Sequence, residues 1–207
     1  MRDIDHIVYC VKKLDPVVDQ LKNLLGIDIV IGGRHLSKGT HNAIFRIGKD
    51  AYFEILAPDP DNNKIVKPRW MGIDLIDKPT ITRWAIKSTN LERDAHSLES
   101  YRSQYGQVEE GSRQLSNGEH LSWKLSDPLP NPKIEVVPFL LDWGDSTHPS
   151  EELKSECHLK QIKVIHNDPS LISDVMTSLS IDIPILKGEH PRIEVELNTP
   201  KGLVTLS

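Results

Sequence analysis

The chain has 207 residues, of which 38% are hydrophobic and 27% are charged, as is usual for a globular protein that buries a core. Its formal net charge is −5, and the chain has no block of basic residues, so nucleic acid is not expected as a partner. No apolar run approaches the ~20 residues of a membrane-spanning helix, so a membrane partner is not expected either. Cys10 and Cys157 have no disulfide-framework or zinc-ribbon spacing, and the first residues do not resemble a signal peptide. These features predict a cytoplasmic protein.

Residues 1–60 predict a first module with one strand, one helix and three further strands. The strands are expected at 4–11, 27–31, 41–47 and 51–57. Asp15 followed by Pro16 is typical of a helix start, with Asp15 as the N-cap, and Gly26 is typical of the helix end. Gly32-Gly33 is expected to form a turn. It does not precede a helix or have the spacing of a phosphate-binding loop.

The same order of elements is predicted twice more. After a linker at 61–79, the second module at 80–142 is expected to have strands at 81–86, 108–115, 120–125 and 134–141. After a connector at 143–158, the third module at 159–207 is expected to have strands at 159–165, 181–186, 192–197 and 203–206. Asn90 and Asp168 are the expected caps of the two helices, and Asn117-Gly118 predicts a hairpin turn.

The predicted fold class is therefore α+β, with repeated βαβββ modules that form curved mixed sheets and a third, degenerate module. Such a module cannot bury the open face of its sheet alone, so two modules must pair, within one chain or across a dimer. With three modules in the chain, the odd one needs a partner or a cover. We therefore expect a homodimer, and which two modules pair is left open.

Two short motifs carry a resemblance to a known superfamily. His6 in Asp5-His6-Ile7-Val8 and Glu54 in Tyr52-Phe53-Glu54-Ile55-Leu56 match the first-strand and fourth-strand positions of glyoxalase and dioxygenase modules. The stretches 32–42 and 138–149 resemble the glyoxalase-like subgroup. The chain thus resembles a glyoxalase-like domain protein of the vicinal oxygen chelate superfamily, which comprises glyoxalases, bleomycin resistance proteins and dioxygenases. In metal-using relatives, the positions of His6 and Glu54 supply metal ligands.

The resemblance implies a possible divalent metal ion, but the expected ligand set is incomplete. A catalytic site of this kind needs about three or four protein ligands. The second module offers Arg83 near the position that matches His6, and it has no counterpart of Glu54; His41 could supply a third ligand. An arginine would repel a cation and favour a carboxylate or phosphate instead. Two hypotheses stay open: a metal ion on His6 and Glu54, or a metal-free hydrogen-bonded pair.

Further polar and aromatic residues are candidates for binding a small molecule. They lie near the mouth of the first module, on the second module and on the connector: Arg34, His35, His41, Asn42, Arg83, Trp143 and His148. His148 could act as an acid or base near neutral pH, and Trp143 could line a pocket or pack between modules.

Two functions are compatible with these features, and whether the protein is an enzyme is left open. The first is an isomerase, lyase or oxygenase that acts on a small carbonyl or diol compound. The alternative is a metal-free, non-catalytic module that binds or sequesters an anionic or aromatic small molecule. In either case the partner is a small molecule.

Overall fold

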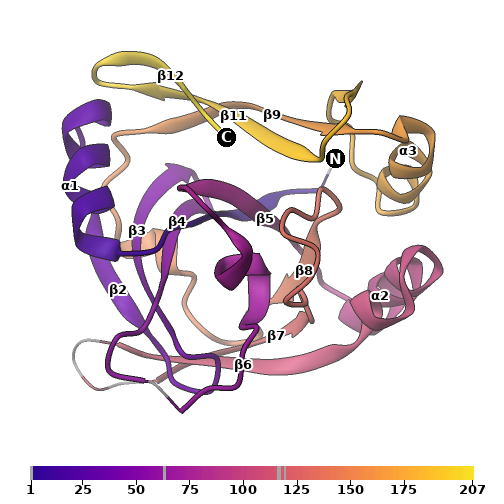
Figure 1. The fold of residues 1–207 in the computed structure, drawn as a ribbon, viewed down its shortest axis with the longest axis horizontal. Coiled ribbons are helices and arrows are strands. Elements are labelled where there is room, and N and C mark those ends of the chain that lie inside the picture. The colour runs from indigo at the N-terminus through magenta and orange to yellow at the C-terminus, as the bar shows by residue number, and fades with distance from the viewer. Residues whose placement is uncertain (1, 63, 116–117, 119) are drawn as a thin grey trace.

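The first two modules close into one barrel within the chain. The computed structural model describes residues 2–62, 64–115, 118 and 120–207, and in these ranges eight strands form a closed barrel in the order β1-β4-β3-β2-β6-β7-β8-β5 (Figure 1). The strands are β1 (Ile4–Cys10), β2 (Val30–His35), β3 (Thr40–Gly48), β4 (Ala51–Pro58), β5 (Thr80–Lys87), β6 (Val108–Leu115), β7 (His120–Ser126) and β8 (Phe139–Asp142). The predicted fold class of βαβββ modules with curved mixed sheets is confirmed.

Two antiparallel seams join the modules. Strand β1 pairs with β5, and β2 pairs with β6. Within each of the two barrel modules the first strand pairs in parallel with the last, as β1 does with β4 and β5 does with β8. Because side chains alternate between the two faces of a strand, every second residue of both modules points into one shared interior.

The third module forms a separate sheet that covers the barrel (Figure 1). Its order is β10-β9-β11-β12, with β9 (His158–His166), β10 (Ile185–Lys187), β11 (Arg192–Thr199) and β12 (Gly202–Leu206). The face with Val164, Ile193 and Val195 is fully buried, whereas Lys163 and Glu194 form an ion pair on the more exposed side. The barrel thus supplies the cover that the odd module needs. The reason for expecting a homodimer is therefore removed, and the dimer stays a prediction.

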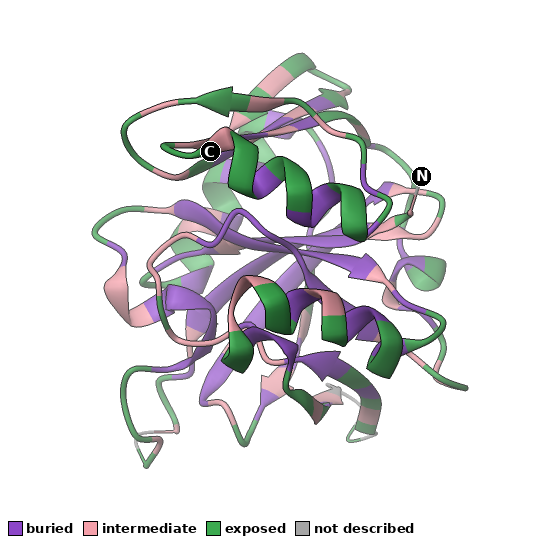
Figure 2. Ribbon diagram, turned by 90° about the vertical axis from the view of Figure 1, so that its right-hand side faces the viewer, coloured by how far each residue is buried: buried purple, intermediate pink, exposed green. Residues whose placement is uncertain are grey.

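In the described ranges three α-helices pack outside the sheets, each with one face buried and one exposed, as Figure 2 shows for the two on the side nearest the viewer. They are α1 (Leu14–Leu25), α2 (Leu91–Tyr101) and α3 (Pro169–Ser178). Asn90 and Asp168 cap α2 and α3 as predicted, because their side chains accept hydrogen bonds from backbone amides of the first turn. Within the described ranges, no helix has the length and apolar character needed to cross a membrane.

The start of α1 differs from the prediction, while its end agrees with it. Lys13 occupies the N-cap position without a side-chain cap, and Asp15 lies inside the first turn. There the carboxylate faces the positive end of the helix dipole but does not cap a backbone amide. Gly26 adopts the left-handed conformation with φ 73°, and its N–H donates to the carbonyl of Lys22, as expected for a residue that ends a helix.

The predicted turn at Gly32-Gly33 is wrong, because both glycines lie inside β2. Residues 36–39 make the turn instead, and the register of β2 against β3 shifts between Ile31 and Arg34. Strand β2 continues past the glycines because Gly33 and Arg34 pair with β6 of the second module. The predicted hairpin turn at Asn117-Gly118 includes Asn117, which lies outside the described residues.

Strand β8 begins at Phe139, later than the predicted residue 134. The preceding carbonyls are taken by side chains: the Trp84 indole donates to Val136 O, and the Tyr105 hydroxyl donates to Val137 O. These bonds replace strand pairing. The second helix ends at Tyr101, and a 3-10 turn (Ser103–Gly106) follows it.

The caps provide a test of the helix starts. We predict that Asp168→Ala lowers the free energy of unfolding by about 1 kcal/mol, because the amide of Leu171 loses its acceptor. Asp15→Ala is the matched control and should cost only a few tenths of a kcal/mol, through the helix dipole alone. Urea unfolding followed by circular dichroism measures both, and equal losses would contradict the assignment of the caps.

Candidate functional site

The barrel encloses a small cavity of about 10 Å³, which is room for about one water molecule. Both modules and the segments that follow them contribute to its wall, whose residues are His6, His35, Tyr52, Glu54, Trp70, Met71, Arg113, Trp123, Leu125, Phe139, Leu141 and Trp143. The wall is aromatic and apolar except for a few charged or polar side chains, a composition typical of small-molecule sites.

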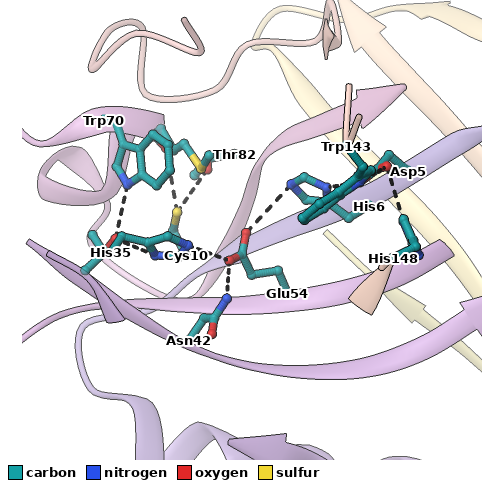
Figure 3. A network of polar contacts seen from close by, with 12 residues as sticks. Asp5, His6, Cys10, His35, Asn42, Glu54, Trp70, Thr82, Trp143 and His148 are labelled. Atoms are coloured by element: carbon teal, nitrogen blue, oxygen red, sulfur yellow. Dashed lines mark hydrogen bonds and ion pairs between the residues drawn. The ribbon is translucent and has the colours of Figure 1, made fainter. Parts of the chain in front are cut away.

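A buried carboxylate orients His6 at this cavity. Asp5 is fully buried; its Oδ1 lies 2.6 Å from Nδ1 of His6, and its Oδ2 accepts a 2.8 Å bond from the Trp143 indole. Nε2 of His148 lies 3.3 Å from the same Oδ2. Burial by itself would raise the pKa of Asp5, but the hydrogen bonds from His148 and His6 hold it well below its usual range. The ionised Asp5 therefore takes the Nδ1 proton of His6 as its hydrogen bond and leaves Nε2 facing Glu54 (Figure 3).

Glu54 lies between two imidazoles on the inner face of β4. Its Oε2 is 3.8 Å from Nε2 of His6, and its Oε1 is 3.9 Å from Nε2 of His35 (Figure 3). Both distances exceed a hydrogen bond. The one direct hydrogen bond found for the Glu54 carboxylate in the described residues comes from the Asn42 amide nitrogen, 2.5 Å from Oε1. Glu54 and His6 thus face one another without a direct bond.

The two glycines of β2 determine how Asn42 is oriented. The backbone N–H of Gly33 donates to Oδ1 of Asn42 over 2.8 Å, which leaves the amide nitrogen free to donate to Glu54. A Cβ at Gly32 would overlap Oδ1 of Asn42, so a side chain there would displace it. Gly32-Gly33 therefore positions Asn42 against the Glu54 carboxylate and is not a simple turn.

His35 is an uncharged member of the site. Burial, together with the positive charge of Arg113, holds the pKa of His35 well below its usual value. Its Nδ1 lies 3.1 Å from Oγ1 of Thr40, which also accepts a 3.2 Å bond from the Trp70 indole. His35 is therefore neutral at physiological pH and is fixed by the wall of the cavity.

Arg113 and Trp123 bring two hydrogen-bond donors from the second module. Their side chains are 4% and 8% exposed, and within the described residues neither Nε of Arg113 nor Nε1 of Trp123 has a hydrogen-bond partner. A Cβ at Gly111, opposite Trp123 on β6, would overlap the indole nitrogen, so this glycine makes room for it. Neither donor is among the residues that the sequence predicts for the site. The alternation of side chains along 108–115 is the signal that could have pointed to Arg113.

The structure brings six of the predicted residues together and places three elsewhere. His6, His35, Asn42, Glu54, Trp143 and His148 meet at or beside the cavity, the last of them through Asp5. Arg34 and His41 alternate with His35 and Asn42 along β2 and β3 and are paired with each other in register, on the opposite face. Arg34 binds the carboxylate of Asp59 there, through contacts of 2.7 and 2.9 Å.

Arg83 does not line the cavity. Its fully buried guanidinium donates to five backbone carbonyls, those of Thr82, Pro128, Leu129, Pro132 and Lys133. These bonds hold the loop before β8 against β5. The positive charge that reaches the cavity comes from Arg113 instead.

The donor set at the cavity does not fit a divalent metal ion. His6 and His35 both face Glu54, yet across the described ranges no group of three or more His, Cys, Asp or Glu side chains is arranged to hold a metal. Asn42 turns its amide N–H toward Glu54 and cannot ligate through that atom, and the guanidinium of Arg113 would repel a cation. The metal hypothesis that the resemblance implied therefore lacks the ligands it needs.

Comparison with known proteins agrees with the architecture. The family model described as glyoxalase-like domain matches residues 4–179. The chain belongs to this family. No curated protein matches the sequence.

Among solved structures, the glyoxalase-like chain is similar to a hypothetical protein from Staphylococcus aureus. The two share 15% identity with a TM-score of 0.62 over 99% of this chain and 85% of that one, which shows a common fold. A methylmalonyl-CoA epimerase in complex with methylmalonyl-CoA and NH4+ has 15% identity and a TM-score of 0.44 over 72% and 99% of the two chains. Methylmalonyl-CoA epimerase from Mycobacterium tuberculosis has 19% identity and a TM-score of 0.39 over 67% and 84%.

The buried carboxylate predicts how stability depends on pH. The pKa of Asp5 in the folded chain lies below its ordinary value of 3.8, so its charge stabilises the fold above that pH, and this contribution is lost as the pH falls below it. We predict that Asp5→Asn lowers the free energy of unfolding by about 3–5 kcal/mol near pH 7, because His6, Trp143 and His148 lose their charged hydrogen-bond acceptor. The difference from the wild type should shrink as the pH falls below about 4.

Urea unfolding at several pH values measures this effect. Asp28→Asn is the control, because Asp28 is exposed and pairs with Lys154 at the surface, where such pairs contribute little. An Asp5→Asn variant as stable as the wild type near pH 7 would show that the Asp5 charge does not support the fold.

Proposed function

We propose that this glyoxalase-like protein binds a small carbonyl compound in its barrel and transfers a proton on it, an isomerase-type reaction that uses no metal ion. The observation that carries the proposal is the pair formed by His6 and Glu54. Nε2 of His6 and Oε2 of Glu54 face each other over 3.8 Å at the cavity wall. Asp5 hydrogen-bonds the other ring nitrogen of His6, and Asn42 hydrogen-bonds the other oxygen of Glu54. Acid–base pairs held in this way suit proton transfer next to a carbonyl group.

In the proposed reaction, Glu54 acts as the base. Its carboxylate takes a proton from the carbon next to the carbonyl, while Asn42 holds its other oxygen in place. His6 donates a hydrogen bond or its proton to the carbonyl oxygen, which becomes an enol or enolate. Asp5 stabilises the protonated form of His6, as a carboxylate does behind a catalytic imidazole. On a 2-hydroxy carbonyl compound, Glu54 then gives the proton to the former carbonyl carbon, and the neighbouring hydroxyl gives its proton to His6. This completes the isomerisation and restores both residues.

Side-chain movement is part of this proposal. The cavity of about 10 Å³ cannot hold a molecule of several heavy atoms, so the wall must open when a substrate binds. Trp123 and Trp143, whose ring centroids lie 5.2 Å apart, line both this cavity and an outer cleft of about 670 Å³. Closure of the two rings over a bound substrate would keep water away from the enolate.

Exchange of hydrogen for deuterium tests the proposal directly. We predict that the wild-type protein in D₂O introduces deuterium next to the carbonyl of at least one of 2-oxobutyrate, 2-oxohexanoate and dihydroxyacetone, as followed by proton NMR. EDTA should leave the rate unchanged. His6→Ala and Glu54→Gln should each lower the rate by about 100-fold or more, because each removes one member of the acid–base pair.

Two exposed residues on α2 provide matched controls. His96→Ala and Glu99→Gln change the same residue types away from the cavity, where the side chains are 83% and 49% exposed, and should leave the exchange rate unchanged. Absence of exchange with every compound, or full exchange in both His6→Ala and Glu54→Gln, would overturn the proposal. A rate abolished by EDTA would restore the metal hypothesis.

A second candidate is a metal-free module that binds an anionic small molecule without turnover. The buried donors of Arg113 and Trp123 favour it, because they bind charge but do not move protons. Tight binding of a compound that shows no deuterium exchange would select this function. The cytoplasmic location stays a prediction in either case.

A further inference from the structure

Two hydrogen-bond donors at the cavity are buried without a partner. In the described part of the chain, Nε of Arg113 and Nε1 of Trp123 are both in this state. A buried donor without a partner is unfavourable, and more so when the group is charged. Both residues point to the same face of the sheet. Arg113 on β6 pairs in register with Leu121 on β7, and Trp123 lies two residues after Leu121 and so on the same face. Donors arranged in this way favour a ligand that brings oxygen acceptors and a negative charge.

Arg113 also connects the cavity with a larger cleft on the outside. This cleft has a volume of about 710 Å³, and Arg113 is part of its lining as well as that of the cavity. About half of the remaining lining residues are apolar, and the others include His120 and Glu152. Val30 is 48% exposed and shares the face of Ile44, its register partner on β3, which also lines the cleft. An apolar chain in the cleft would cover Val30.

We infer that the ligand is a carboxylic acid with an apolar chain, whose carboxylate is bound by Arg113 and Trp123 and whose chain lies in the outer cleft. Arg113 stands where the cleft meets the cavity, so its guanidinium and the Trp123 indole supply donors to the two carboxylate oxygens. The chain packs on Val30 and Ile44. The inference rests on the proposed function for the position of the reacting carbon beside His6 and Glu54, and binding itself needs no proton transfer.

Binding of simple fatty acids tests this inference on the full chain. Isothermal titration calorimetry with butanoate, hexanoate and octanoate should show affinity rising by about fourfold for each added methylene that is buried. Hexanamide, which has the same chain without the charge, should bind at least about tenfold more weakly than hexanoate. Chain-length independence would overturn the cleft assignment, and equal affinity for hexanamide would overturn the carboxylate assignment. Absence of binding by all three acids would overturn the inference as a whole.

Variants assign the effects to the residues named. Arg113→Met should lower hexanoate affinity by about tenfold or more, whereas Arg34→Met, on the outer face of β2, should have no effect. Trp123→Phe keeps an aromatic ring and removes only the N–H. It should also weaken hexanoate binding, so the test stands even if Arg113→Met does not fold. Unchanged affinity in Trp123→Phe and in folded Arg113→Met would contradict the assignment of the donors.

The cleft has its own pair of variants. Val30→Ser should weaken octanoate binding more than butanoate binding, and Val66→Ser, at an apolar position that is 86% exposed elsewhere, should affect neither. An equal effect of Val30→Ser on both acids would overturn the cleft assignment. Because the titration measures affinity and needs no turnover, fatty acids that bind to a protein without deuterium exchange would support this inference while the proposed isomerase function fails.

Discussion

The arrangement of the site depends on one buried charge, the carboxylate of Asp5. A fully buried carboxylate is stable only when donors surround it, and Asp5 has three, from His6, Trp143 and His148. Two of these donors come from the connector that follows the barrel, more than 130 residues away in the sequence. The need to satisfy one charge therefore ties this connector to β1 and, at the same time, fixes the ring of His6 toward Glu54.

The two modules of the barrel contribute different chemistry to the shared interior. The first supplies His6, Glu54 and the Asn42 amide that positions Glu54, whereas the second supplies the donors of Arg113 and Trp123. This division follows from the antiparallel seams, which turn alternate residues of both modules into one space. The third module adds no residue to the cavity wall and instead covers the barrel from outside.

Local signals in the sequence are sufficient for most elements and fail where a distant strand intervenes. Asn90 and Asp168 cap their helices because capping depends on neighbouring residues alone. Gly32-Gly33 has the composition of a turn, yet pairing with β6 extends β2 through both glycines. The strand expected from residue 134 starts late, because the side chains of Trp84 and Tyr105 take the carbonyls that strand pairing would have used.

For the site, the sequence by itself determined the family resemblance and its two marker positions, His6 and Glu54, since these depend on short motifs within single strands. Only the tertiary structure decided what surrounds them. It places Arg83 among loop carbonyls and Arg113 at the cavity, because the direction of an arginine depends on register and strand curvature over the whole barrel. It also reveals Asp5 as the residue that orients His6, since its partners come from segments that no local pattern connects to β1.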